Sequence, residues 1–501
     1  MTINKKSIEA TPVKIKKGSI LGMRHVQSFL LFFNVTSIYC SRLNIGVAVV
    51  AMTNSATANP DFPEFEWSEK EISYIISSFF WGYVCTQFPG GYLCKKFGAK
   101  LVMSVATCIS ALLSAATPWS VGWGSWRILC FIRIVQGLAQ GVIFPCVYEH
   151  LAKWVPLKER NRLGAFALSG SDCGTILAMA VSGIIAKGQW GWPGIYYVSA
   201  GICFAWCVIW LIFGENNPNE SKYIGSQERN FIAAEMAHSE GYHKKKIPFP
   251  WKAVLTSTPF YVLILARSCQ NWGLSTIHAQ IPSYLSGVLN MDIKANGLYS
   301  SLPFIAMWVM SYVYLSLADI LQSKTSISLT SLRRLFNSLG SWLPALGLVI
   351  IGFLDEHQKI WAIVLMTLIV ALNSGNIIGS ALNMIDLAPN HAGIMMSLVN
   401  AVSNITPFIS PLIVGVVVTD VTNRTLWQIV FIIAAAIFFF GNLLYILLGT
   451  AETQPWNAED YLQEKCGKRS HIHGYDNNIE ILEIQVKSFD AKDSNFKSVK
   501  K

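Results

Sequence analysis

Twelve apolar runs, separated by short polar stretches, occupy most of this 501-residue chain. A helix needs about 20 consecutive apolar residues to cross the hydrocarbon core of a bilayer. A helix also satisfies all of its own backbone hydrogen bonds, which a spanning segment must do. The pattern therefore predicts an all-α membrane protein with twelve transmembrane helices. The expected spans are residues 26–52, 70–94, 98–119, 124–153, 162–187, 192–213, 256–287, 296–318, 332–353, 358–386, 391–419 and 425–449.

Composition supports this class and excludes others. Hydrophobic residues make up 52% of the chain and charged residues only 14%, which is far from the average of soluble domains. The net charge of +10 would suit a protein that binds nucleic acid. Most basic residues, however, lie in the tails and in short loops between apolar runs, as in membrane proteins whose cytoplasmic loops are positive. We therefore expect no nucleic-acid partner.

The loops that alternate along the chain differ in charge. Basic residues gather in the N-terminal tail and in later loops on the same side, whereas the first loop on the other side carries acids. Since basic loops stay in the cytoplasm, we expect both termini to be cytoplasmic. The plasma membrane is the expected compartment, and a lysosome or vesicle is the alternative. The basic residues include Lys5, Lys6, Lys14, Lys16, Lys17 and Arg24, and the acids are Asp61, Glu64, Glu66 and Glu69.

The longest interior polar stretch falls between the sixth and seventh apolar runs, at residues 214–255. It divides the chain into two bundles of six helices, residues 26–213 and 256–450, which is typical of transporters built from repeats. Residues 1–25 and 451–501 are expected to be cytoplasmic tails, and residues 214–255 a cytoplasmic loop.

Three arginines lie inside apolar runs, at Arg42, Arg133 and Arg267. An arginine near the bilayer midplane costs about 2.5–3.5 kcal/mol on insertion scales, so it usually faces a cavity or a partner. Guanidinium groups aimed at an internal cavity indicate an anionic cargo, because their planar fork matches carboxylate and phosphate oxygens.

Polar side chains accompany two of these arginines on the same helix face. Gln136 and Gln140 follow Arg133 at helical spacing, and Asn271 follows Arg267 by one turn. The spacing predicts that these residues bind the substrate together with the arginines. A structural role is the alternative for Arg133, which could hold a backbone carbonyl, and Arg267 could extend to the cytoplasmic surface.

Two titratable residues inside the runs are candidates for cation coupling. Asp172 lies about ten residues into the span 162–187, near the bilayer midplane, where a carboxylate needs a partner or an altered pKa. We expect it either to pair with an arginine or to bind the coupling cation. Histidine in general titrates near neutral pH, so His278, which shares a helix face with Arg267, could carry a proton. A hydrogen-bonded, neutral histidine is the alternative at position 278.

Several strings are specific enough to indicate a family. FFWGYVCTQFPGGYLCKKFGAK, RIVQGLAQGV, KWVPLKERNRLG and NMIDLAPNHAGIMMSLVNAVSNITPFISP occur in this order. Together they resemble the anion:cation symporter family of the major facilitator superfamily, over roughly residues 20–456. The resemblance implies alternating-access transport of inorganic phosphate or small organic anions, coupled to sodium or protons, with no bound cofactor. It also implies that Arg42 and Arg133 are substrate arginines.

Differences from the family pattern indicate which branch of the family this sequence resembles. An acid found after the fourth-helix arginine in sialin and the vesicular transporters is replaced by Gln136 and Gln140. A histidine of the vesicular glutamate transporters is replaced by Ile76, and their seventh-helix arginine by Gln270. The sequence is thus more similar to type I sodium–phosphate cotransporters and to insect inorganic phosphate cotransporters. A proton-coupled, sialin-like carrier of lysosomes or vesicles is the alternative.

The string GGYLCKKFGAK resembles the superfamily's loop between the second and third helices, which braces the cytoplasmic side. We expect Lys95 and Lys96 to act in gating there, with Glu149 on the fourth helix and Asp319 at the comparable place in the second half. Asn423 begins an Asn-Arg-Thr glycosylation pattern on the outer side.

The expected partners are a small anion, a co-transported cation and the lipid bilayer, and the protein is expected to be a monomer. The sequence carries no phosphate-binding loop, no paired acids and no nucleophile–base set, so we do not expect an enzyme. A receptor with a transporter-like body is the alternative of another class.

Overall fold

The computed structural model describes residues 22–242, 249–354, 356–458 and 461, and within them it contains helices and no strand. The all-α prediction is therefore confirmed for this part of the chain. The helices are α1 (Met23–Leu43), α2 (Ile45–Thr53), α3 (Glu69–Phe97), α4 (Ala99–Gln140), α5 (Ile143–Trp154), α6 (Leu157–Leu168), α7 (Gly170–Lys187), α8 (Gly191–Phe213), α9 (Ser226–Tyr242), α10 (Trp251–Val254), α11 (Thr258–Gly287), α12 (Ile293–Lys324), α13 (Leu329–Leu339), α14 (Trp342–Ile351), α15 (Lys359–Asn373), α16 (Leu382–Leu387), α17 (Ala392–Ser403), α18 (Thr406–Val417) and α19 (Arg424–Leu448), with a π-helical turn at Ile377–Ala381 and 3₁₀ turns at Ser55–Thr57, Glu356–Gln358, Pro389–His391 and Pro455–Asn457.

Ten helical segments among the described residues are long and apolar enough to cross a membrane. One of them, Ala99–Trp123, lies within α4, and the next, Ser125–Trp154, runs from the rest of α4 through α5. The chain reverses direction between them near Ser125, where φ is +68°. Helices α3 and α11, with 29 and 30 residues, have the length of a span but are less apolar. Both run between the two halves of the molecule, where polar side chains need not face lipid.

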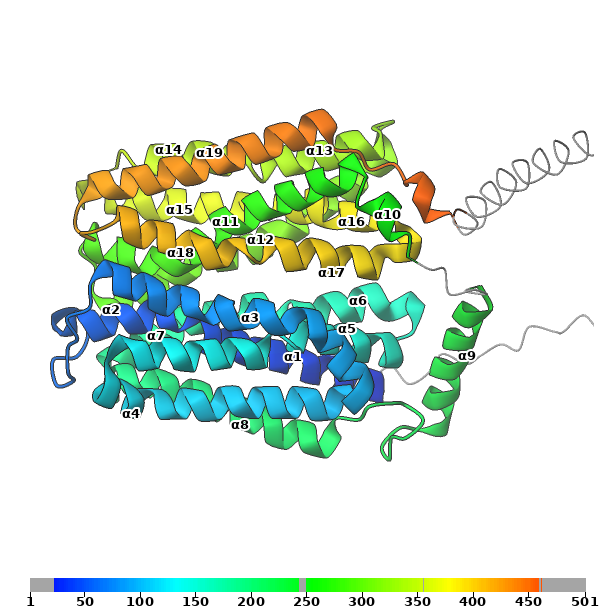
Figure 1. Ribbon diagram of the computed structural model, residues 1–501, viewed down its shortest axis with the longest axis horizontal. Helices are drawn as coiled ribbons and strands as arrows, with labels where there is room; N and C mark the ends of the chain where they lie inside the picture. The colour runs from blue at the N-terminus through cyan, green and yellow to red at the C-terminus, as the bar shows by residue number, and fades with distance from the viewer. Residues whose placement is uncertain (1–21, 243–248, 355, 459–460, 462–501) are drawn as a thin grey trace, which may run out of the picture.

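Two bundles lie side by side with their helices roughly parallel (Figure 1). Helices α1–α8 form the first bundle, here called the N-half, and α11–α19 form the second, the C-half. The halves meet where α2 contacts α11, α3 contacts α18 and α7 contacts α12. One end of the molecule holds the first residue of α1 and the last residue of α19, and we call it the tail end. The opposite end holds residues 54–68, and we call it the far end.

At the far end the halves are in close contact. Gly183 of α7 faces Gly297 of α12 so closely that a Cβ atom on Gly183 would lie 2.9 Å from the Gly297 Cα and 2.7 Å from a backbone oxygen. Beside them, the Lys187 ammonium donates to the Asp292 carboxylate at 2.5 Å. On the other side of the interface, a Cβ atom on Gly415 would lie 2.1 Å from a side-chain oxygen of α3. Glycine thus allows the helices to seal this end.

At the tail end, part of the central polar segment is folded against the N-half. The Glu228 carboxylate of α9 accepts hydrogen bonds from the first backbone N–H groups of α1 and pairs with Arg24 at 3.0 Å. Arg24 also pairs with Glu159 of α6 at 2.6 Å. The stretch that we predicted as a loop therefore contains the helix α9. This helix docks at the start of α1 because the Glu228 carboxylate satisfies backbone donors there that have no partner within α1.

Candidate functional site

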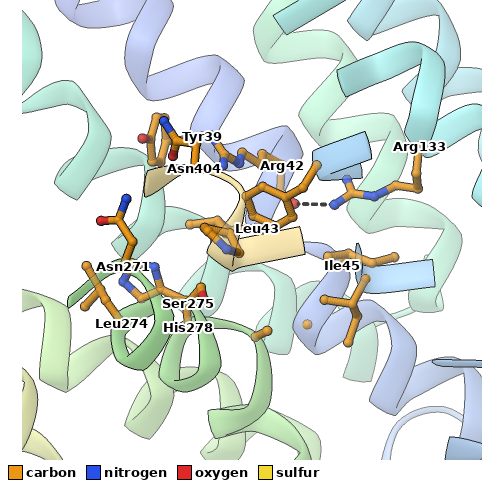
Figure 2. Close-up of a pocket in the computed structure, with 15 residues that line it drawn as sticks. Tyr39, Arg42, Leu43, Ile45, Arg133, Asn271, Leu274, Ser275, His278 and Asn404 are labelled. Carbon is orange, nitrogen blue, oxygen red and sulfur yellow. Dashed lines mark hydrogen bonds between the residues drawn. The ribbon is translucent and has the colours of Figure 1, made fainter. Parts of the chain in front are cut away.

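A cavity of about 150 Å³ lies between the halves, and both contribute to its walls (Figure 2). The N-half supplies two guanidinium groups, and the C-half supplies amide, hydroxyl and imidazole groups. We call it the central cavity. Its lining residues are Tyr39, Arg42, Leu43, Ile45, Gly46, Ile76, Phe80, Arg133, Asn271, Leu274, Ser275, His278, Ala279, Asn404 and Pro407.

Interrupted helices form two of these walls. The first span breaks at Asn44, between α1 and α2, and the eleventh breaks between α17 and α18 at Asn404 and Ile405. Leu43 and Ile45 flank the first break, and Asn404 itself lines the cavity at the second. Broken helices are tolerated at membrane depth where they line a cavity, because the backbone groups can find other partners there.

Arg133 lies at the first of these breaks. Its Nη2 donates to the backbone carbonyl of Arg42 at 3.0 Å, as the dashed line in Figure 2 shows. The side chain is 3% exposed, and its Nε is buried with no acceptor. Arg133 thus holds a backbone carbonyl, the structural role considered from the sequence, and also lines the cavity.

Arg42 lies among aromatic rings. Its guanidinium carbon is 4.7 Å from the ring centre of Phe79, 4.8 Å from those of Phe80 and Tyr83, and 5.4 Å from that of Tyr39. Its Nε is buried without an acceptor. The rings attract the guanidinium through their negative faces.

No carboxylate in the described part of the chain pairs with the positive charge of the cavity. The lining includes two arginines and no aspartate or glutamate. Among the described residues, none of Arg42, Arg133 and Arg267 forms an ion pair. An anion that entered would supply the missing charge, and buried charges are stable when paired.

The C-half faces these arginines with neutral groups. Asn271, Ser275 and His278 of α11 and Asn404 line the opposite wall. The His278 ring lies 4.5 Å from the Phe304 ring, and its Nε2 is buried with no partner. The His278 side chain thus lines the cavity, while its Nε2 is enclosed and forms no hydrogen bond with a described residue.

Gln136 and Gln140 lie on the same helix as Arg133 but do not line the cavity. The Gln136 side chain donates to Ser114 at 3.1 Å, and that of Gln140 donates to Ser41 at 3.2 Å. These bonds join helices within the N-half. Helical spacing predicted that Arg133, Gln136 and Gln140 bind the substrate together. Of the three, only Arg133 lines the cavity, and the two glutamines serve packing.

Arg267 also lies outside the central cavity. Its Nη1 donates to Gln270 at 2.6 Å, while its Nε is buried without an acceptor. Arg267 interacts electrostatically with Tyr148. Tyr148 lines a second, larger cavity, so Arg267 lies toward the tail end rather than at the centre.

The second cavity, of about 380 Å³, opens between the halves toward the tail end. Its lining includes Gln87, Phe144, Glu149 and Asn400. A thin partition separates it from the central cavity: the Asn404 amide donates to Gln87 at 3.4 Å across the halves. The halves are thus apart at the tail end and closed at the far end.

Asp172 does not line either cavity. It is half-buried near the start of α7, close enough to Tyr39 to interact electrostatically with its hydroxyl, and it forms no ion pair with a described residue. Tyr39 lies between this carboxylate and Arg42, whose guanidinium it contacts. A coupling role for Asp172 stays a prediction.

The expected gating residues lie at the tail end. Lys95, Lys96 and Asp319 are exposed. Glu149 pairs with Lys153 one turn later at 3.4 Å. Asn423 is exposed at the far end, where its side chain caps α19 by accepting from the Thr425 backbone N–H at 3.0 Å. Gating by the first four and glycosylation of Asn423 stay predictions.

Sequence reasoning missed the aromatic side chains around Arg42. Phe79, Phe80 and Tyr83 occupy one turn of α3, and Tyr39 precedes Arg42 by three residues. The run FFWGY contains them, but aromatic residues in an apolar helix are ordinarily packing residues. Sequence reasoning also missed Ser275 and Asn404 in the wall formed by the C-half, because small polar residues are common in such helices.

Comparison with known proteins agrees with this architecture. The sequence profile of the Major Facilitator Superfamily matches residues 31–385. The chain is 34% identical to a "Putative inorganic phosphate cotransporter" of Drosophila melanogaster, over 87% of each chain. It is 33% identical to vesicular glutamate transporter 1 of Bos taurus, over 93% of this chain and 82% of that protein.

Among solved structures, the fold is similar to that of a bacterial homologue of the human lysosomal transporter Spinster in an inward-facing, unoccupied conformation. The TM-score is 0.65 at 12% identity, over 87% of this chain and all of the other. This likeness concerns the fold. The superfamily and these relatives are transporters and not enzymes, and membership of the superfamily implies twelve spans in two bundles. The chain belongs to the anion:cation symporter family of the Major Facilitator Superfamily.

Proposed function

We propose that this membrane protein is a secondary active transporter of small anions, either inorganic phosphate or a small organic anion. The central cavity is the observation that carries the proposal. Arg42 and Arg133 both line a space between the halves whose described lining contains no carboxylate. Guanidinium binds phosphate and carboxylate through paired hydrogen bonds, and a dry cavity strengthens that attraction. Relatives named as phosphate and glutamate transporters support an anionic cargo.

Alternating access is the proposed mechanism. The far end is sealed at Gly183 and Gly297, while the tail end is open into the larger cavity. Basic loops favour a cytoplasmic tail end, with both termini on that side and the plasma membrane as the compartment. The structure would then represent the inward-facing state. Rocking of the halves would open the far end by separating α7 from α12.

Cation coupling is part of the proposal, because moving one negative charge into a cell at about −60 mV costs about 1.4 kcal/mol. A co-transported sodium ion or proton would offset this cost. Asp172 and His278 are the proposed coupling residues. The first is a half-buried carboxylate that forms no ion pair with a described residue, and the second lines the cavity with an enclosed ring nitrogen that has no hydrogen-bond partner among the described residues.

Asp172→Asn tests the carboxylate. It removes the charge and keeps the shape, so we expect the dependence of uptake on sodium or proton concentration to shift, with the KM for the anion changing less than about threefold. Uptake in proteoliposomes at a series of cation concentrations measures this. Superimposable cation curves for wild type and variant would remove Asp172 from the coupling role.

The Lys187–Asp292 pair predicts a charge effect at the far end. The Lys187 ammonium holds the pKa of Asp292 below its ordinary value, and the Ala295 backbone N–H contributes. The pairing is therefore present above the ordinary carboxyl pKa of about 4 and is lost as pH falls through the lowered value. Far-side pH between about 5 and 8 should not alter it.

Asp292→Asn keeps the acceptor that caps α12 but removes the charge. We expect the far end to be open up to about fivefold more often, since exposed pairs are weak. A cysteine at Ser73, which is 3% exposed against α18, reports opening through labelling by an impermeant maleimide in a background without other cysteines. An unchanged labelling rate would contradict a gating role for the pair.

The proposed function is tested by uptake of a panel of radiolabelled anions into proteoliposomes. Phosphate, urate, glutamate and sialic acid are each offered under an imposed sodium gradient, proton gradient or potential, with empty liposomes as the control. We expect saturable uptake of at least one anion that depends on one of the gradients. Uptake of none of them, with correctly inserted protein, would reject the proposal.

A vesicular organic-anion carrier is the second candidate. The 33% identity to a vesicular glutamate transporter favours it, as does the His278 Nε2, which has no hydrogen-bond partner among the described residues. The same panel separates the two: uptake of an organic anion but not of phosphate, driven by an inside-positive potential or by protons without sodium, supports the vesicular candidate. Phosphate uptake driven by sodium or by protons, or sodium-driven uptake of an organic anion, supports the first.

A further inference from the structure

Two like charges share one aromatic ring at the centre of this protein. The Phe79 ring centre is 4.7 Å from the guanidinium carbon of Arg42 and 4.9 Å from that of Arg133. Phe79 is fully buried on α3, in the interior of the N-half. Two cations this close to one another repel, and the repulsion is strong in a medium of low polarity.

Neighbouring rings extend the same environment. Phe80 and Tyr83 contact Phe79, with ring centres 5.5 Å and 5.8 Å away, and both also lie 4.8 Å from the Arg42 guanidinium carbon. Tyr39 adds a fourth ring from α1. We call Tyr39, Phe79, Phe80 and Tyr83 the aromatic box.

An arginine held by aromatic rings keeps its positive charge and its hydrogen-bond donors available to a ligand, whereas an arginine held by a carboxylate does not. A carboxylate would neutralise an arginine, and an incoming anion would have to displace it. A ring attracts the cation through its quadrupole but carries no net charge and accepts no conventional hydrogen bond. The orphaned Nε atoms of Arg42 and Arg133 agree with this: both arginines are held, yet their donors are not fully used.

We propose that the aromatic box positions the two arginines of the anion site, with Phe79 as the shared element that allows both to stay charged beside each other. This inference rests on the proposed function, since it concerns how that site binds an anion. Tyr39 and Phe80 of the box also line the cavity, but Phe79 does not. Phe79 therefore acts through the arginines, as a positioning residue that does not itself contact the substrate.

A series of fluorinated phenylalanines at position 79 tests the proposal. One, two and three ring fluorines weaken the negative face of the ring in steps while its volume changes little. Cation–π contacts of desolvated groups are worth about 1–2 kcal/mol, so we expect the KM for the transported anion to rise stepwise, to about 5- to 30-fold, with kcat little changed. A role in packing alone predicts no such trend.

Phe336 is the matched control. It is also fully buried, packs against the Tyr314 ring and contacts no guanidinium that the structure describes. The same fluorinated series at position 336 should leave KM unchanged. A flat KM series at Phe79, or equal trends at both positions, would overturn the inference.

A second readout does not depend on transport. The melting temperature of the purified protein should fall stepwise with fluorination at Phe79, and this trend should disappear when Arg42 and Arg133 are both replaced by methionine. If the trend is present but no anion is taken up, the box is real and the proposed function fails. If an anion is taken up but both the KM and melting series are flat, the proposed function stands and the box fails.

Discussion

Replacing Arg133 by alanine is expected to reduce anion uptake by roughly 100-fold, because a charged pair of hydrogen bonds to the substrate is lost. The change also removes the bond to the Arg42 carbonyl at the helix break. Uptake of the transported anion into proteoliposomes, normalised to the amount of inserted protein, measures the effect. Arg42→Ala should have an effect of similar size.

Arg127→Ala is the matched control for this prediction. Arg127 is exposed on the same helix, six residues before Arg133, and its guanidinium lies over the Trp126 ring rather than in the cavity. It loses the same charge without touching the site, so uptake should stay within about twofold of wild type. Wild-type uptake by Arg133→Ala would show that Arg133 serves the helix break alone.

Gly183→Ala is expected to slow transport, because the halves can no longer close tightly at the far end. The added Cβ would lie 2.7 Å from the Ile293 carbonyl oxygen and 2.9 Å from the Gly297 Cα, and neither backbone group can move without shifting α12. Overpacking of this kind typically costs about 1–3 kcal/mol, which would disfavour the closed far end about 5- to 150-fold. Uptake should fall about tenfold or more, and labelling of a cysteine at Ser73 should rise.

Gly201→Ala provides the comparison. Gly201 lies on the exposed side of α8, and a Cβ atom there would meet nothing within 4 Å. Both changes replace a helical glycine by the best helix former, so the gain in helix propensity is the same. Normal uptake by both variants would show that the close approach of α7 and α12 is not needed in the transport cycle.

The architecture could be predicted from the sequence because its signals are long and repeated. Apolar runs of about 20 residues are set by the thickness of the bilayer, and the two-half arrangement is set by one long polar stretch. What could not be predicted is local. Helix α9, within the polar stretch, is held against the N-half by its own Glu228. The Glu228 carboxylate accepts hydrogen bonds at the start of α1, about 200 positions earlier in the sequence.

The candidate site was predicted in part. Arg42, Arg133, Asn271 and His278 do line one cavity, because charged and amide groups cannot face lipid. Arg267 could not be distinguished from them by composition. Its distance from the central cavity depends on how far along α11 the halves meet, which is a property of packing between helices and is not contained in the pattern of one helix.

A structure of the protein with its transported anion bound tests the central claim most directly. We predict density for the anion in the central cavity, within about 3.2 Å of guanidinium nitrogens of both Arg42 and Arg133. An anion bound elsewhere, in contact with neither guanidinium group, would contradict the account.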